Sequence, residues 1–78
     1  MTRDEALVWL AGIFDEPAEK VRPETPRDEI FGWDSMGMLT LMADIDEKFN
    51  IRLGAKDLKD MTKVQDVLNM LEQHGVFG

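Results

Sequence analysis

The stretch DSMGMLTLMADIDEKF, Asp34 to Phe49, decides the fold of this chain. From Ser35 onward its apolar residues recur at the i, i+3, i+4, i+7 and i+11 spacing of an α-helix, which places them on one narrow face. These residues are Met38, Leu41, Met42, Ile45 and Phe49. The pattern predicts a helix over Ser35 to Phe49 with this stripe turned toward a core.

Two further segments, near the two ends of the chain, carry a stripe of the same kind. Thr2 and Glu5 have the spacing of a capping box that opens a first helix, and Thr62 and Gln65 have the spacing of a second box that opens the last helix. Gly75 is expected to end the last helix, because glycine readily adopts the left-handed conformation found there. The stripes are Leu7, Leu10, Ala11 and Phe14 on the first helix and Val64, Val67, Leu68 and Leu71 on the last.

The connections between these helices differ in length. Asp15 to Gly32 contains three prolines and no sustained helical period, so we expect a long ordered loop with a short helical turn near Asp28 to Phe31. Ala55 to Met61 fits one short helix after a glycine. The side chains expected to anchor these connections in the core are Val21, Ile30, Phe31, Leu58 and Met61. The predicted fold is therefore all-α: a small bundle of three main helices and one short helix, with a long loop between helices one and two.

Composition limits the class of function. The 78 residues suffice for a single domain, 1–78, with one core and with its function on the surface. Sixteen acidic against nine basic side chains give a net charge of −7, which disfavours nucleic acid and favours partners with basic surfaces. Cysteine is absent and no residue pattern predicts a metal site. The longest apolar run, Ala6 to Phe14, is too short to cross a bilayer and follows no net-positive segment, so we expect a cytoplasmic chain without membrane insertion.

Ser35 is a candidate for a chemical role, because it lies between an aspartate and the start of an apolar helix. A hydrolase nucleophile is disfavoured, since Gly32 lies three residues before Ser35 instead of two and no strand precedes it. The only histidine, His74, lies far along the chain, so no catalytic residues are predicted. Two interpretations are left open: Asp34 or Ser35 caps the helix, or Ser35 is a serine that another enzyme modifies. A cap alone does not explain the residues that follow.

A second apolar patch is expected beside Ser35 on the same helix. The step of about 100° per residue turns it away from the core stripe. Its members are Met36, Leu39 and Ala43, and its polar rim consists of Thr40, Asp46 and Glu47. An apolar strip edged by carboxylates suits a basic, partly apolar partner, whereas a wider buried face in a crowded bundle has the same spacing. The sequence leaves both interpretations open.

The stretch GWDSMGMLTLMADIDEKFNI, Gly32 to Ile51, resembles the acyl carrier protein family, including its peptidyl and D-alanyl carrier domains, around the modified serine of a D-S-[LM] motif. The resemblance extends through nearly the whole chain, from the capped first helix and long loop to Thr62-Lys63-Val64 at the start of the last helix. It implies that Ser35 carries a 4'-phosphopantetheine group, added from coenzyme A with magnesium by a separate phosphopantetheinyl transferase, and that Asp34 assists this transfer. Acyl or aminoacyl groups would then travel as thioesters on a protein that is not itself an enzyme.

The same resemblance implies roles for the rest of the second helix. Met36, Leu39, Ala43 and Glu47 match positions that face partner enzymes, and Leu41, Ile45 and Phe49 match the core that lines an acyl pocket. Thr40 departs from the family, because many fatty acid synthase carriers have an acid there. The implied partners are the transferase and acyl-loading, elongating or transferring enzymes with basic docking surfaces, in fatty acid, lipid or specialised, polyketide-like biosynthesis, and the carrier is expected to be a monomer. An unmodified acidic helical protein-interaction module is the alternative, and the sequence does not name the cargo.

Three single residues carry further expectations. Gly37 lies in the first turn of the predicted helix, where glycine costs about 1 kcal/mol relative to alanine. It either clears space for the arm or a partner backbone, or is a plain irregularity. Trp9 is expected to contact the core, and His74 to be solvated or to cap a helix end.

Overall fold

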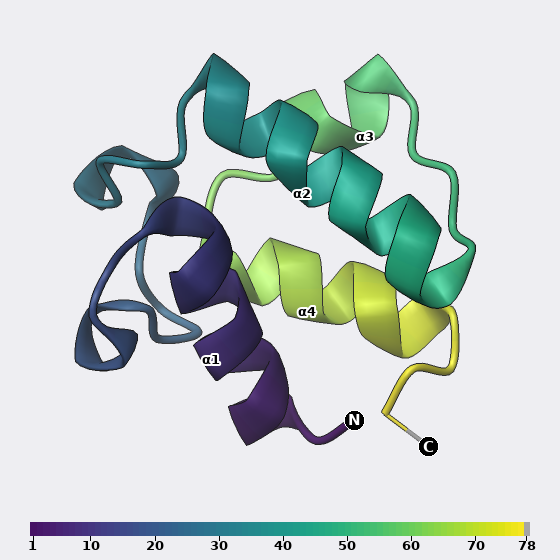
Figure 1. Cartoon of the computed structure of the whole chain (residues 1–78), viewed down its shortest axis with the longest axis horizontal. Helices are drawn as coiled ribbons and strands as arrows, with labels where there is room; N and C mark the ends of the chain where they lie inside the picture. The colour runs from purple at the N-terminus through teal and green to yellow at the C-terminus, as the bar shows by residue number, and fades with distance from the viewer. Residues whose placement is uncertain (78) are drawn as a thin grey trace.

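The computed structural model describes residues 1–77. Within this range there are four α-helices and two short 3₁₀ helices, and no helix is long and apolar enough to cross a membrane. The elements are α1 (Arg3–Phe14), η1 (Ala18–Lys20), η2 (Arg27–Glu29), α2 (Ser35–Phe49), α3 (Ala55–Lys59) and α4 (Val64–Gln73). Figure 1 shows the three long helices around a common centre, with the short α3 next to α2 and a long connection between α1 and α2. The predicted all-α bundle is confirmed.

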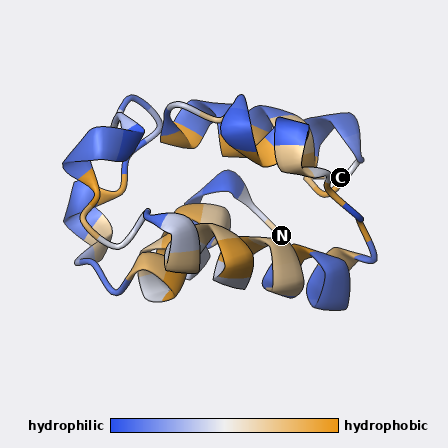
Figure 2. Ribbon diagram, turned by 90° about the horizontal axis from the view of Figure 1, so that it is seen from above, coloured by the Kyte–Doolittle hydropathy of each residue, from blue (hydrophilic) through white to orange (hydrophobic). Residues whose placement is uncertain are grey.

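The core is formed by the apolar stripes that the sequence predicts. Figure 2 shows the hydrophobic residues of the upper layer of helices turned toward the lower layer. The largest side chains with less than 2% exposure come from α1, the long loop, α2 and α4: Leu10, Phe14, Val21, Leu41, Ile45, Val64, Val67, Leu68 and Leu71. Each stabilises the fold by about 1.5–3 kcal/mol before entropy is counted. The stripe of α2 is narrower than expected, because Met38, Met42 and Phe49 are only half-buried at the edge of this core.

The long loop is ordered because its main chain pairs with the start of α4. Its hydrogen bonds run from Arg27 N to Thr62 O (2.8 Å), from Val64 N to Thr25 O (3.0 Å) and from Gln65 N to Pro23 O (2.9 Å). Backbone groups that would otherwise lose their partners on folding are satisfied in this way. The pairing fixes the path of the chain as it enters α2.

One predicted anchor of this loop is wrong. Phe31, expected in the core, is 92% exposed, whereas Ile30 and Trp33 are buried. The cause is local backbone geometry: Ile30 N donates to Arg27 O (3.1 Å) and Trp33 N donates to Ile30 O (3.0 Å), which turns Ile30 and Trp33 inward and Phe31 outward. Trp33 stacks on Phe14 with ring centroids 5.0 Å apart. The helical turn itself is present as η2, one residue earlier than predicted at its start.

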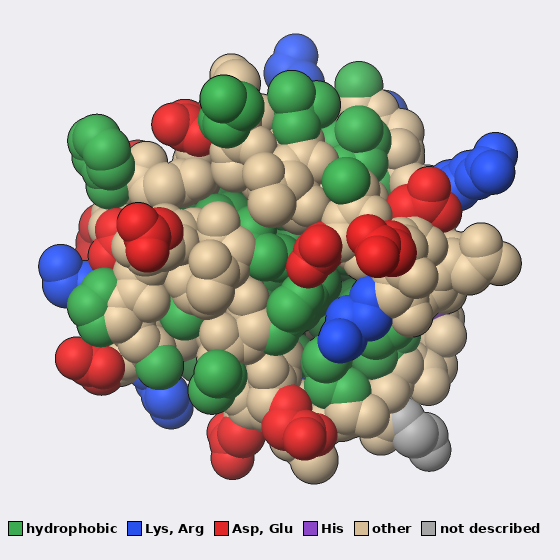
Figure 3. All heavy atoms as spheres, in the orientation of Figure 1, with side chains coloured by type: hydrophobic (Ala, Val, Ile, Leu, Met, Phe, Trp, Pro, Cys, Tyr) green, Lys and Arg blue, Asp and Glu red, His purple; other side chains and the backbone are tan. Residues whose placement is uncertain are grey.

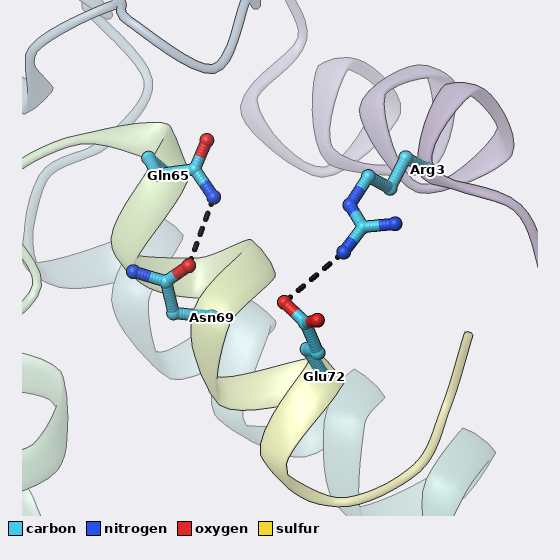
Figure 4. A network of polar contacts seen from close by, with 4 residues as sticks. All are labelled: Arg3, Gln65, Asn69 and Glu72. Carbon is cyan, nitrogen blue, oxygen red and sulfur yellow. Dashed lines mark hydrogen bonds and ion pairs between the residues drawn. The ribbon is translucent and has the colours of Figure 1, made fainter. Parts of the chain in front are cut away.

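The start of α4 also differs from its prediction. Lys63, not Thr62, is the N-cap, so the third helical position is Asp66 and not Gln65. The Asp66 carboxylate accepts hydrogen bonds from the N–H groups of Thr62 (2.8 Å) and Lys63 (3.2 Å) and from the Thr62 hydroxyl (3.1 Å). The Gln65 side chain instead donates to Asn69 Oδ1 at 2.9 Å, as Figure 4 shows. A shift of one residue in the helix start therefore replaces one capping side chain by another.

Replacing Asp66 with alanine is expected to destabilise the protein by about 1 kcal/mol at neutral pH, because a carboxylate that binds backbone N–H groups at a helix start is lost. Burial alone raises the pKa of Asp66, but the hydrogen bonds from Thr62 and Lys63 outweigh it, so the pKa lies below its ordinary value. Stabilisation from a lowered pKa is present above the unfolded-state value and is lost as the pH falls through the folded-state value.

Urea unfolding of both proteins from neutral to acidic pH checks this expectation. The difference in unfolding free energy between wild type and Asp66→Ala should shrink as the pH falls below the ordinary carboxyl range. A difference that stays constant down to the lowest pH would contradict a role for the ionised carboxylate.

The remaining helix ends agree more closely with the sequence. α3 stops at Lys59, two residues before the predicted end, yet Leu58 and Met61 are both buried as expected. His74 is the C-cap of α4, with Nδ1 2.9 Å from the carbonyl oxygen of Met70, and Gly75 follows with φ +74°. The predicted stop at the glycine and the capping role of the histidine are confirmed.

Trp9 and Arg3 also connect α1 to its neighbours through their side chains. Trp9 is half-buried and contacts the core from the edge, as predicted; its Nε1 donates to Asp44 Oδ2 (2.9 Å) and its ring meets Phe49 edge-on at 5.6 Å. Arg3 pairs with Glu72 of α4 at 3.0 Å, as seen in Figure 4. Because both partners of this ion pair are more than half exposed, it contributes at most about 1 kcal/mol. Of these contacts only those of Trp9 reach α2, where they add to the packing of its buried face.

Candidate functional site

Ser35 is the first residue of α2 and the only serine of the chain. Its side chain is exposed. The preceding residue, Asp34, forms the N-cap: its Oδ1 accepts the N–H of Gly37 (2.9 Å), and its main-chain oxygen accepts the N–H of Met38 (2.9 Å). Of the two capping residues that the sequence allows, the structure selects Asp34. The Ser35 hydroxyl is left facing solvent at the start of the helix.

The nearest route to self-catalysis would need a base beside Ser35. His74 lies at the end of α4, and Figure 1 shows the start of α2 and the end of α4 on opposite sides of the molecule. The structure thus does not bring the histidine to the serine. A histidine–serine pair of the kind that activates a nucleophile is therefore not formed between these two residues.

Two glycines fix the position of Ser35. A Cβ atom on Gly37 would lie 2.0 Å from the carbonyl oxygen of Gly32, and a Cβ atom on Gly32 would lie 2.0 Å from the carbonyl oxygen of Phe14. The end of α1, the loop and the first turn of α2 are therefore in direct backbone contact. The interpretation that Gly37 clears space for the arm or a partner is wrong, because the backbone that approaches it is the chain's own.

The second apolar patch of α2 is on the surface. Met36 is 74% exposed and Leu39 is 57% exposed, so this face is not part of a wider core. Ala43 and the predicted rim residues Thr40, Asp46 and Glu47 are exposed as well. Figure 3 shows hydrophobic side chains standing out along the upper edge of the molecule, over α2. The structure brings this patch and Ser35 together on one exposed surface.

The residues predicted to line an acyl pocket lie on the other face of α2. Leu41 and Ile45 are fully buried, and Phe49 is half-buried against Trp9. All three contact the hydrophobic core.

Sequence reasoning missed two features of this site. One is the buried Trp33 beneath the entry to α2, and the other is the pair of glycines in backbone contact. The only signal for them is the occurrence of glycine and tryptophan immediately around Asp34 and Ser35, and that signal does not say which segment they contact.

Comparison with known proteins agrees with this geometry. Residues 8–71 match the family model of the phosphopantetheine attachment site. The acyl carrier protein of Thermobifida fusca (strain YX) is 34% identical over 73 residues, covering 88% of this chain and 92% of that protein. Those of Kocuria rhizophila and Syntrophus aciditrophicus are each 29% identical, covering 91% and 97% of this chain and 93% and 96% of the relatives.

The chain belongs to the acyl carrier protein family. Its prosthetic group is accordingly a covalently attached 4'-phosphopantetheine, as the sequence resemblance implied. This membership disfavours the alternative of an unmodified interaction module.

Proposed function

We propose that Ser35 is the attachment residue and that the chain carries acyl or aminoacyl groups between enzymes of fatty acid, lipid or specialised, polyketide-like biosynthesis. It does so in the cytoplasm, as a monomeric single domain, without catalysing a reaction itself. The observation that carries this proposal is the exposed hydroxyl of the chain's only serine, at the start of a capped helix inside the matched region.

The residues at the start of α2 fit a phosphodiester on Ser35. The first N–H groups of a helix have no acceptor within the helix, and here Asp34 accepts the one from Gly37. The N–H groups of Ser35 and Met36 belong to the same first turn, where the partial positive charge of the helix end favours a negative group. A phosphate attached to the Ser35 oxygen is thus stabilised by the helix that positions it.

Asp34 has two functions in this proposal. Its Oδ1 accepts a hydrogen bond from the N–H of Gly37, which stabilises the first turn of the helix on which Ser35 is exposed. Oδ2 is the oxygen proposed to contact the magnesium ion that the transferase uses. When bound, the prosthetic group supplies a thiol that holds the acyl cargo, which explains how a chain without cysteine performs thiol chemistry.

The exposed patch of α2 is the proposed docking surface for partner enzymes. An apolar strip next to carboxylates suits a partner with an apolar groove and a basic rim. Its residues are Met36, Leu39, Thr40, Ala43, Asp46 and Glu47. Leu41, Ile45 and Phe49 are the proposed lining for an acyl chain that enters the bundle.

Intact-protein mass spectrometry tests the proposed function. The chain is incubated with coenzyme A, magnesium and a broad-specificity phosphopantetheinyl transferase, and a known carrier serves as a control for enzyme activity. The expected result is the mass of one added phosphopantetheine, which fragmentation assigns to the peptide containing Ser35. If the folded chain gains no mass while the control carrier is modified, the carrier function is rejected and the alternative of an unmodified interaction module is favoured.

A further inference from the structure

Phe31 is the most exposed of the large hydrophobic side chains in residues 1–77. At 92% exposure it contributes nothing to the core, since Ile30 and Trp33 fill the inward positions of the same loop. Beside it lies an open hollow of about 790 Å³. Its apolar lining is Pro26, Ile30, Phe31 and Trp33, and its polar lining is Arg27, Asp28, Thr62 and Lys63. Figure 3 shows a hydrophobic side chain projecting at the upper left, over the loop that precedes α2. The fold does not require an aromatic side chain at this position.

Phe31 extends the exposed apolar surface to the other side of Ser35. It precedes Ser35 by four residues, while Met36 (74% exposed) and Leu39 (57% exposed) follow it by one and four. Gly32, the neighbour of Phe31, lies against Gly37 in the first turn of α2, so the loop that carries Phe31 is close to the start of the helix. Along the chain, Ser35 is thus flanked by one exposed apolar residue on the loop and two on α2.

The charge around these flanks is mostly negative, although Arg27 and Lys63 line the hollow beside Phe31. Between residues 28 and 47 there is no lysine or arginine, and the six acidic residues are Asp28, Glu29, Asp34, Asp44, Asp46 and Glu47. Asp28 and Glu29 lie on η2, immediately before Phe31, and both are exposed. A protein that covers both flanks must present apolar groups to Phe31 and Met36 and positive groups to the acids around them.

We propose that Phe31 is a docking anchor for the phosphopantetheinyl transferase, inserted into an apolar pocket that lysine or arginine side chains border on that enzyme. The inference rests on the proposed function of Ser35. The transferase is the proposed partner because it must bring its active site to the serine oxygen itself. Later partners react with the end of a long arm. An interface of ordinary size covers about 800 Å² of each partner, which is enough to include both sides of the serine. Phenylalanine is among the aromatic residues that are enriched in the buried centres of protein interfaces.

The test compares the transferase kinetics of four unmodified proteins: wild type, Phe31→Ala, Phe31→Leu and Val8→Ala. Val8 is the matched control, because it is 61% exposed on α1 and lies outside the stretch around Ser35. We expect Phe31→Ala to lower kcat/KM by about 10- to 100-fold, mainly through KM, because a buried aromatic contact is lost. Phe31→Leu should keep most of the wild-type value, and Val8→Ala should match wild type.

Thermal unfolding separates docking from folding. An exposed side chain contributes little to stability, so all four proteins should melt at similar temperatures. A kcat/KM for Phe31→Ala equal to that of wild type would overturn the docking role while leaving Ser35 modification intact. If the wild type itself gains no phosphopantetheine, the proposed function fails, and the inference fails with it.

Discussion

A chain with Ser35→Ala is expected to gain no mass in the transferase reaction and to carry no cargo. The hydroxyl that would bond to the phosphate is gone, and the sequence offers no second serine. Thr40, the nearest hydroxyl on α2, donates to the carbonyl oxygen of Met36 (3.0 Å) within the helix and lacks the position at the helix start. The loss should therefore be complete within the detection limit of intact-protein mass spectrometry.

The fold of this variant should be unchanged, which makes the result interpretable. The cap bond from Gly37 to Asp34 does not use the serine, and alanine is a good helix former at an exposed position. Circular dichroism should show a stability within about 0.5 kcal/mol of wild type. Ser35→Ala should also still bind the transferase through Met36 and Leu39. Stoichiometric modification of this variant would place the attachment residue elsewhere and refute the assignment of Ser35.

The helices were predictable because their signals are local. The i, i+3, i+4 spacing of α2 is a property of one segment, and a helix with a continuous apolar stripe can bury it in only one orientation. The capping box at Thr2 and the helix stop at Gly75 were predicted correctly for the same reason, because each depends on residues only a few positions apart. The wrong prediction that Gln65 completes a capping box also has a local cause. The N-cap is Lys63 and not Thr62, so the capping side chain three residues later is Asp66.

The surroundings of Ser35 were predictable only in part. The motif singled out Ser35 itself, but periodicity could not decide whether Met36 and Leu39 were core or surface, since this depends on which elements cover that face. Phe31 is exposed and not in the core as expected, because a 3₁₀ turn directs Ile30 and Trp33 inward in its place. No pattern in a single sequence predicts which distant segments of the chain come into contact.

Gly37→Ala is expected to destabilise the protein by about 2 kcal/mol or more, although alanine favours helix by about 1 kcal/mol. Its Cβ atom would lie 2.0 Å from the Gly32 carbonyl oxygen, far inside contact distance. Gly32 cannot move aside, because it is itself in backbone contact with Phe14. The clash must then be relieved by separating α2 from the end of α1, which exposes core surface. For a chain of this size the melting temperature should fall by about 10 °C or more.

Gly12→Ala is the matched control, because it makes the same substitution in a helix where, apart from the adjacent residues and the backbone of its own helix, no atom lies within 4 Å of the new Cβ. Gly12 is exposed on α1, so only the propensity effect remains, and the variant should be more stable by about 0.5–1 kcal/mol. If the melting temperature falls in Gly37→Ala and rises in Gly12→Ala, the glycine of α2 is required for backbone packing and not for helix flexibility. If Gly37→Ala were stabilised like Gly12→Ala, the close approach of Gly32 would be wrong, and the start of α2 would be free to adjust around Ser35.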